Sequence, residues 1–306
     1  MKILMKKLSN KALYIIAIAT CLFCFVILII YLVNINDYEN KSELGKAELF
    51  VKRITSPQAM AFDKEGRLFV QSDWDGKISI INKDGTAMDY SYIEKYYGYG
   101  MDIDYSDNFI IASKQQVTVF DNSGNVIRSI MGFDHAYDVE RGPGNLIFVS
   151  DSATNNIYSI SPKNEVAIFA ELGDKKSINI PNVAGICFDN DYKNLYTVNM
   201  YSGDIYKISL SKEYKVEKIE IIASNLQRPN FIDVDEKGNI FITCLGDNTI
   251  VRINQNSIKE IIDTKGKVSS PSGIAINNNG KVLYVGSKDN NSIYKINIGT
   301  NSQTKK

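Results

Sequence analysis

His135 is the only histidine among the 306 residues, and it limits the imidazole chemistry that the chain can perform. A metal site built from two histidines is excluded, and any Ser-His-Asp triad must use His135 as its base. The chain has no Walker phosphate loop, no dinucleotide fingerprint, no Gly-x-Ser-x-Gly and no His-Glu-x-x-His. We therefore take His135 as a catalytic candidate, with a hydrogen-bonded filler histidine as the alternative.

Two Pro-Asn phrases place the amides of Asn182 and Asn230 just ahead of apolar runs. Amide oxygens can ligate a hard cation such as Ca²⁺ or Mg²⁺, but carboxylates normally complete the shell. Asn182 and Asn230 are the candidate metal ligands. A site without any cofactor is the prediction, and a divalent cation is the alternative.

Aromatic side chains offer a second kind of site. Residues 88–100 hold five tyrosines, and Trp74 and Tyr201 lie in polar loops. Such rings suit recognition of a peptide or a glycan, because they offer a large contact area at low entropic cost. The alternative is that the tyrosines pack between neighbouring sheets.

A sixfold repeat should position these residues. Each copy is a short apolar run that ends in an acid or amide, then a turn, a second apolar run, a loop and a third run. The ends of the first run are Asp63, Asp104, Glu140, Asp189, Asp235 and Asn277. This spacing is close to the roughly 40–50 residues of propeller blades, and most copies are followed by a fourth apolar stretch. The sequence predicts an all-β, six-bladed β-propeller over residues 47–300.

The alternating direction of the strands selects one face for the site. The starts of all the inner strands must share a face, and the residues there should surround the mouth of a central channel. The predicted ligand-binding set combines these with two loop aromatics: Gln58, Trp74, Tyr99, His135, Asn182, Tyr201, Asn230 and Ser272.

The two ends of the chain complete the domain assignment. The sixth copy lacks a fourth strand, so residues 47–54 are predicted to close the last blade and remove a free sheet edge. Residues 301–306 form a polar tail. Residues 12–33 are uncharged and would make a helix about 33 Å long, enough to cross a membrane.

Lysines dominate residues 1–11, so the positive-inside rule predicts a cytoplasmic stub, a signal-anchor helix and an extracytoplasmic propeller. A cleaved signal peptide is the alternative, but its apolar core is normally shorter. Residues 34–46 form a tether. The chain has 35 basic and 35 acidic residues and no basic stripe, so nucleic acid is not an expected partner.

The rhythm of Pro57, Met60 and Asp63, followed by Leu68-Phe-Val and an Asp-containing loop, resembles NHL repeats. NHL proteins are six-bladed propellers that mostly bind proteins, peptides or nucleic acid. This resemblance covers most of residues 47–300 and implies fold more than function.

The phrases around Asn182 and Asn230 also resemble the gluconolactonase/regucalcin family. That resemblance implies a divalent cation at the channel mouth and hydrolysis of lactones or esters. Asn182 matches the family's asparagine ligand, but Asn230 stands where an aspartate is usual and Gln58 where a glutamate is usual. A weaker resemblance is to streptogramin lyases, which use a histidine with nearby glutamates; His135 and Glu140 are the candidates here.

These observations favour a membrane-tethered propeller that binds a protein, peptide or glycan at the outer surface, and they favour a non-catalytic role. A metal-dependent, gluconolactonase-like hydrolase is the alternative.

Overall fold

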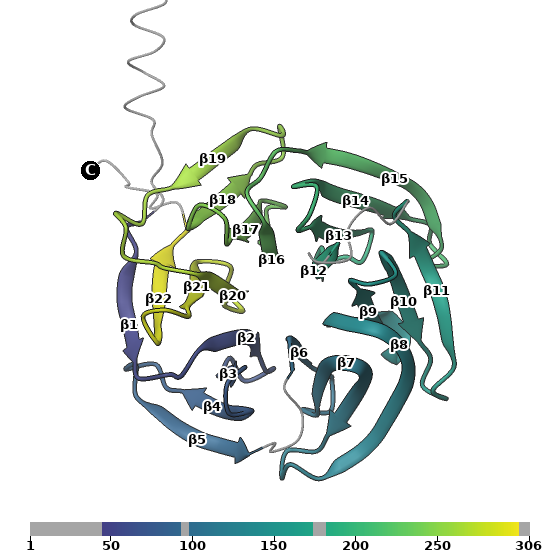
Figure 1. Ribbon diagram of the computed structural model, residues 1–306, viewed down its shortest axis with the longest axis horizontal. Helices are drawn as coiled ribbons and strands as arrows, with labels where there is room; N and C mark the ends of the chain where they lie inside the picture. Colours follow the sequence, from purple (N-terminus) through teal and green to yellow (C-terminus); the bar gives the residue numbers. More distant parts are fainter. Residues whose placement is uncertain (1–44, 93–97, 174–181, 300–306) are drawn as a thin grey trace, which may run out of the picture. The chain divides into compact units, whose positions relative to one another are not determined.

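A computed structural model describes residues 45–92, 98–173 and 182–299, and this part of the chain consists of β-strands, turns and one 3-10 helix, η1 (Pro143–Asn145). The strands form sheets arranged around a central axis, each with an inner strand near the axis and an outer strand at the rim (Figure 1). The predicted all-β propeller is therefore confirmed.

Four of the sheets contain four antiparallel strands each. The first comprises β2 (Pro57–Phe62), β3 (Leu68–Ser72), β4 (Lys77–Ile81) and β5 (Ala87–Tyr92). The second comprises β12 (Val183–Phe188), β13 (Asn194–Asn199), β14 (Ile205–Leu210) and β15 (Val216–Ala223). The third comprises β16 (Pro229–Val234), β17 (Ile240–Cys244), β18 (Thr249–Ile253) and β19 (Lys259–Ile262). The fourth comprises β20 (Pro271–Ile276), β21 (Val282–Ser287), β22 (Ser292–Asn297) and β1 (Glu48–Lys52).

The remaining sheet contains six strands, namely β6 (Gly100–Ile103), β7 (Phe109–Phe120), β8 (Val126–Arg141), β9 (Ile147–Asp151), β10 (Asn156–Ile160) and β11 (Val166–Glu171). The described residues thus form five sheets, and the prediction of six separate blades is wrong. The reason is that β7 and β8 are long and continuous, so they join the second and third copies of the repeat into one sheet. The innermost segments still contact one another in a closed cycle of β2, β6, β8, β12, β16 and β20.

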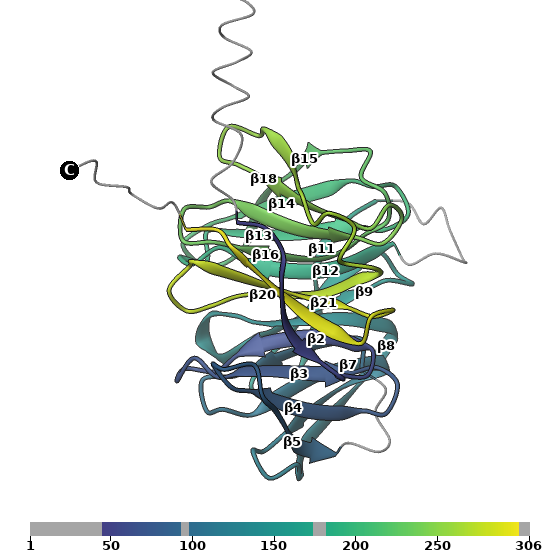
Figure 2. The same ribbon diagram turned by 90° about the vertical axis from the view of Figure 1, so that its left-hand side faces the viewer.

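The start and the end of the ring meet in one sheet. Strand β1 pairs with β22, with Glu48 opposite Lys295 and Lys52 opposite Ser292. Figure 2 shows the purple β1 running beside the yellow strands from the other end of the chain. This is the pairing that closure of the ring requires, because it covers the edge of β22. Val51 is buried in this contact, whereas Leu49 on the opposite face is exposed.

The first turn of each copy is shaped by its closing residue. In the fifth copy, Asp235 accepts hydrogen bonds from the backbone N–H groups of Lys237 and Asn239, as short polar side chains do in tight turns. The third copy differs. The backbone N–H of Gly142 donates to the carbonyl of Leu146. The backbone N–H of Asp235 makes the equivalent turn contact with the carbonyl of Asn239. Gly142 therefore holds the closing position, and the prediction that Glu140 holds it is wrong by two residues.

Aromatic side chains fill the space between neighbouring sheets. The ring of Tyr90 lies 5.1 Å from Phe69 and 5.5 Å from Phe109, in edge-to-face or tilted contact. Such contacts add to the burial of apolar area. For Tyr90, packing between the sheets is thus the observed role. Cys187 and Cys244 are buried and free.

Within residues 45–92, 98–173 and 182–299 we find no helix that is long and apolar enough to cross a membrane. The predicted anchor, residues 12–33, lies outside the described residues, as do the stub, most of the tether and the tail.

Candidate functional site

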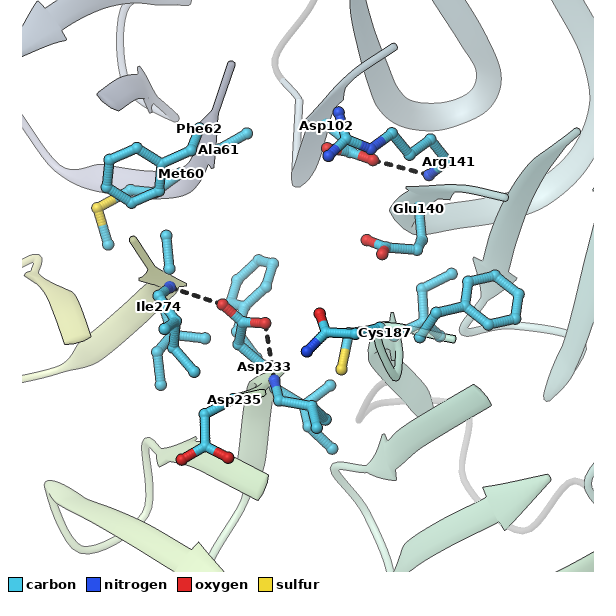
Figure 3. A pocket seen from close by; sticks show the side chains of 18 of the residues that line it. Met60, Ala61, Phe62, Asp102, Glu140, Arg141, Cys187, Asp233, Asp235 and Ile274 are labelled. Atoms are coloured by element: carbon cyan, nitrogen blue, oxygen red, sulfur yellow. Dashed lines mark hydrogen bonds between the residues drawn. The ribbon is translucent and has the colours of Figure 1, made fainter. Parts of the chain in front are cut away.

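The channel carries acidic side chains near the ends of the inner strands. With Gly142 in the closing position, Asp102 of β6, Glu140 of β8 and Asp233 of β16 fall at one level, two residues before the turn. The corresponding residues of the other inner strands are Ala61, Cys187 and Ala275. The side chains at this level line a cavity together (Figure 3).

Three aspartates connect neighbouring inner strands. Asp233 accepts a bond of 2.7 Å from the N–H of Val234 and another of 2.7 Å from Ile276 on β20. Asp102 does the same with Ile103 and with Arg141 on β8, again at 2.7 Å each. An inner strand pairs with its sheet on one side only, so N–H groups on its other side need acceptors. These carboxylates supply them.

Asp138 repeats this arrangement one layer further into the channel. Its two oxygens accept the N–H groups of Val139 and of Ile186 on β12, at 3.0 Å each. A Cβ at Gly100 would overlap with this carboxylate, so glycine is required where β6 passes it. The side chain of Asp138 thus fixes the separation of three inner strands.

Glu140 is the acid of this group without such contacts. Among the hydrogen bonds of the described residues, none involves its carboxylate. Burial raises its pKa well above the ordinary value, and the charges of Asp102 and Asp233 raise it further. Glu140 therefore faces the cavity as an acid without a hydrogen-bond partner among the described residues, and the charge of Arg141 offsets this rise of its pKa only in part.

The other channel groups are shifted in the same direction. Burial raises the pKa of Asp138 and of Asp233 to about 7, although the backbone N–H bonds of each oppose that change. Burial likewise raises the pKa of Asp102, against the influence of Arg141. These directions all indicate that the protein compensates the ionised forms poorly, so these acids keep their protons to a higher pH than usual.

Arg141 is the one cationic side chain along the cavity, and it is engaged elsewhere. Its Nη1 donates to the carbonyl of Ile103 at 2.6 Å. Its guanidinium lies 5.2 Å from the centre of the Tyr105 ring. Arg141 offsets part of the charge of Asp102 and of Glu140, and the acidic groups that line the cavity still outnumber it.

The cavity has a volume of about 290 Å³ and lies at the ends of the inner strands and their following turns. Seven carboxylates and one guanidinium line it, together with apolar walls that include Met60, Ile232 and Ile274. Ligand pockets usually measure roughly 300–1,000 Å³, so this one suits a small ligand. Its chemistry selects for positive charge.

A compact group of metal-ligand atoms lies elsewhere. Asp63, Glu65 and Asp107 have ligand atoms within 4.8 Å of one another, the one such group of His, Cys, Asp or Glu in the described residues. Asp63 is paired with Arg67 at 2.5 Å, and Asp107 with Lys64 at 2.6 Å. Since Lys64 and Arg67 already offset most of this negative charge, we assign no metal to the group.

The predicted ligand-binding residues lie at or near the opposite ends of the inner strands. The rings of Tyr99 and His135 are in edge-to-face contact at 5.0 Å, as predicted for residues of one face. Nδ1 of His135 lies 2.6 Å from the hydroxyl of Ser152, which is buried. Burial lowers the pKa of His135, which favours the neutral imidazole.

The two candidate metal ligands have protein partners. The Asn230 side-chain oxygen accepts a bond of 2.6 Å from the hydroxyl of Tyr137. The side-chain nitrogen of Asn182 donates to the carbonyl of Ser152 at 3.1 Å. Both asparagines are buried. They stabilise the packing at this end of the channel.

The remaining predicted residues are dispersed. Ser272 is buried and its hydroxyl donates to the carbonyl of Pro57. Gln58 is also buried, and its Oε1 has no hydrogen-bond partner within the part of the chain that the structure describes. Trp74 and Tyr201 are exposed loop side chains, with 75% and 47% of their surface accessible.

Sequence reasoning missed Tyr137 and the aspartates Asp102, Asp138 and Asp233, and it named Glu140 only as a turn residue and through the resemblance to streptogramin lyases. Tyr137 stacks on Tyr99 with ring centres 5.5 Å apart and planes inclined by 16°. Tyr137 occupies the position in β8 that corresponds to Gln58 in β2 and to Asn230 in β16. His135 does not occupy that position. The distance from the closing residue to the second strand would have given the correct alignment of the third copy. Asp63 precedes Leu68 by five positions, and Gly142 precedes Ile147 by the same number.

Comparison with known proteins defines the class but not the family. No protein-family model matches the chain, and no curated protein matches it. Solved structures with the same fold include virginiamycin B lyase from Staphylococcus aureus, in a catalytically inactive form with quinupristin, at a TM-score of 0.65 and 16% identity. That match covers 83% of this chain and 99% of the lyase.

A gluconolactonase from Xanthomonas campestris has a TM-score of 0.67 at 12% identity, over 81% of this chain and 88% of the other. A luciferin-regenerating enzyme has a TM-score of 0.62 at 12% identity, over 82% of this chain and 93% of the other. The chain is therefore a β-propeller whose fold is similar to that of these lyase, lactonase and regenerating enzymes. At such low identity the likeness concerns the fold alone, and the similarity to NHL repeats stays a prediction.

Proposed function

We propose that this protein is a ligand-binding propeller that takes a small cation into the acidic cavity at the ends of the inner strands. The observation that carries the proposal is the Glu140 carboxylate, which faces a cavity with seven carboxylates and one guanidinium and has no hydrogen-bond partner among the described residues. A bound cation would supply the missing charge, and its attraction is strong because the site is partly shielded from water.

A thermal melt of the full-length chain tests this function. The protein is treated with EDTA and then with Ca²⁺, Mg²⁺, Mn²⁺, Zn²⁺ or 1,4-diaminobutane in turn. A cation at about 100 times its Kd should add roughly 2.7 kcal/mol of stability, which raises Tm by a few degrees. The shift should vanish in Glu140→Gln and persist in Glu217→Gln, because Glu217 is exposed on the outer strand β15. If no cation changes Tm, the cavity is not a cation site.

A metal-dependent, gluconolactonase-like hydrolase is the second candidate. The observations in its favour are the fold shared with gluconolactonases and the short contact between His135 and Ser152. Incubation with lactones and aryl esters, with EDTA and then with Ca²⁺ or Mg²⁺, tests it. Turnover that disappears in both His135→Ala and Ser152→Ala would favour the hydrolase. Absence of turnover in all conditions would leave the binding role.

The membrane-tethered, extracytoplasmic location is a proposal from residues 1–46 alone. The exposed Trp74 and Tyr201 are the side chains we propose for contact with a protein, peptide or glycan there. Protease treatment of intact cells tests the location: the propeller should be digested from outside, and protection until the cells are lysed would contradict it.

A further inference from the structure

We infer that the ligand of the acidic cavity is a small aliphatic diamine rather than a metal ion. This inference rests on the function proposed above and concerns the same cavity. It adds the chemical class of the cation, which follows from how the donor groups are arranged and from the apolar groups that share the cavity.

The spacing of the channel carboxylates does not suit a metal ion. Ca²⁺ and Mg²⁺ need about six oxygen ligands at roughly 2.0–2.6 Å, so the ligand atoms must lie within a few ångströms of one another. The compact group found among the described residues is Asp63, Glu65 and Asp107, which is outside the cavity. The acids of the channel are dispersed around it.

The channel aspartates are also partly committed. Each oxygen of Asp102 and Asp233 already accepts one backbone N–H, at 2.7 Å. The remaining lone pairs can accept a further N–H at hydrogen-bonding distance. An ammonium group fits such acceptors, because it donates three N–H bonds and does not need a closed shell of oxygens.

Two acidic positions face one another across the cavity. Asp102 and Glu140 come from the adjacent strands β6 and β8, and Figure 3 shows them on one side with Asp233 facing them. The strand β12, which carries Cys187, lies between β8 and β16 in the ring. Two linked ammonium groups can satisfy both positions at once.

Part of the cavity lining suits the hydrocarbon linker of such a ligand. Met60, Ile232 and Ile274 line the cavity. Cys187 lines it as well: its thiol is free, only 4% of the residue is exposed, and no hydrogen bond of the described residues involves its sulfur (Figure 3). A buried thiol without a partner is a weakly polar surface that methylene groups can contact without cost. The volume of about 290 Å³ limits the ligand to a short chain.

Isothermal titration of the full-length chain tests the inference with four probes: 1,4-diaminobutane, 1-aminobutane, 1,4-butanediol and MgCl₂. The diamine should bind with one site per chain, about 10- to 100-fold more tightly than the monoamine, because it makes a second charge-assisted contact. The uncharged diol and Mg²⁺ should not bind.

Glu140→Gln and Asp233→Asn should each weaken diamine binding by about tenfold or more and bring it near that of the monoamine. Glu140→Gln is the cleaner variant, since no hydrogen bond of the described residues involves the Glu140 carboxylate, and Glu217→Gln is the matched control on β15. Equal affinity for diamine and monoamine, or binding of Mg²⁺ that needs Glu140, would overturn the diamine and keep the cation site. If no cationic probe binds, the proposed function fails as well.

Discussion

One oxygen of Asp138 accepts the backbone N–H of Ile186 at 3.0 Å, across the gap between the inner strands β8 and β12. The other oxygen accepts the N–H of Val139, next in its own strand. Asp102 and Asp233 make the same pair of bonds to their own strand and to the following one. Acidic side chains thus stabilise three contacts between inner strands, and the same side chains make the cavity negative.

Substitution of Asp138 by asparagine should lower the free energy of unfolding by about 1–3 kcal/mol. Asparagine keeps one side-chain oxygen as an acceptor. Its NH₂ group takes the place of the other oxygen, so one buried backbone N–H loses its acceptor. Thermal and urea melts of the full-length chain measure the change. Asp134→Asn is the control, because Asp134 lies on the same strand but is exposed, and it should change stability by less than about 0.5 kcal/mol. Equal effects of the two variants would show that the bridge to Ile186 contributes nothing.

The repeat determines most of the fold from sequence, because apolar runs bounded by turn residues appear in every copy. Two features could not be obtained in this way. The second and third copies share one sheet because β7 and β8 continue through the usual breaks. Gly132, with a φ of 116°, marks only an irregularity in the pairing of β8 with β7 and does not end the strand. The third copy ends in Gly142 rather than in an acid, so an alignment on acids shifts it by two residues.

That shift explains what sequence reasoning found and missed at the candidate sites. It placed His135 at the position that belongs to Tyr137, and it assigned Glu140 to a turn instead of the channel. The acidic cavity depends on residues from β6, β8 and β16, which become neighbours only when the ring closes. The spacing of residues along the chain does not show that these three strands become neighbours.

Replacement of Tyr137 by phenylalanine should cost about 1–3 kcal/mol, because it leaves the buried side-chain oxygen of Asn230 without its donor. The rings of Tyr137 and Tyr99 would still stack, so the fold should persist. Tyr214→Phe is the control, since Tyr214 is 40% exposed. Thermal melts of both variants measure the difference. A Tyr137→Phe protein as stable as the control would mean that Asn230 finds another partner.

Strand β1 should contribute to the stability of the whole ring. Val51→Ala removes two methyl groups that are 3% exposed, and it should lower the free energy of unfolding by roughly 2 kcal/mol. Leu49→Ala, on the exposed face of the same strand, should have little effect. Deletion of residues 48–54 should unfold the propeller, because β22 then loses its partner. A deletion variant with unchanged Tm would contradict closure of the ring by β1.

Stability should fall as pH rises from about 4 to 8. Burial raises the pKa of Asp138 and Asp233 to about 7 in the folded chain, above the usual value near 3.8, so the folded state binds these protons more tightly than the unfolded state. The resulting stabilisation is complete below pH 4 and is lost as pH passes through 7. The charged or titratable groups around Glu140 include Asp102 on β6, Asp138 and Arg141 on β8, Cys187 on β12, Tyr192 in the turn after β12, and Asp233 on β16.

Melts of the full-length chain at pH 5 and pH 8 measure this dependence, and Glu140→Gln provides the comparison. The variant lacks one titrating carboxylate whose pKa is raised, and it removes repulsion from Asp102 and Asp233, so its Tm should fall less between the two pH values. Saturating 1,4-diaminobutane should likewise reduce the loss of stability at pH 8, since it binds the ionised carboxylates. A Tm that rises with pH in the unmodified chain would mean that the backbone N–H bonds to Asp102, Asp138 and Asp233 outweigh burial and keep these groups ionised.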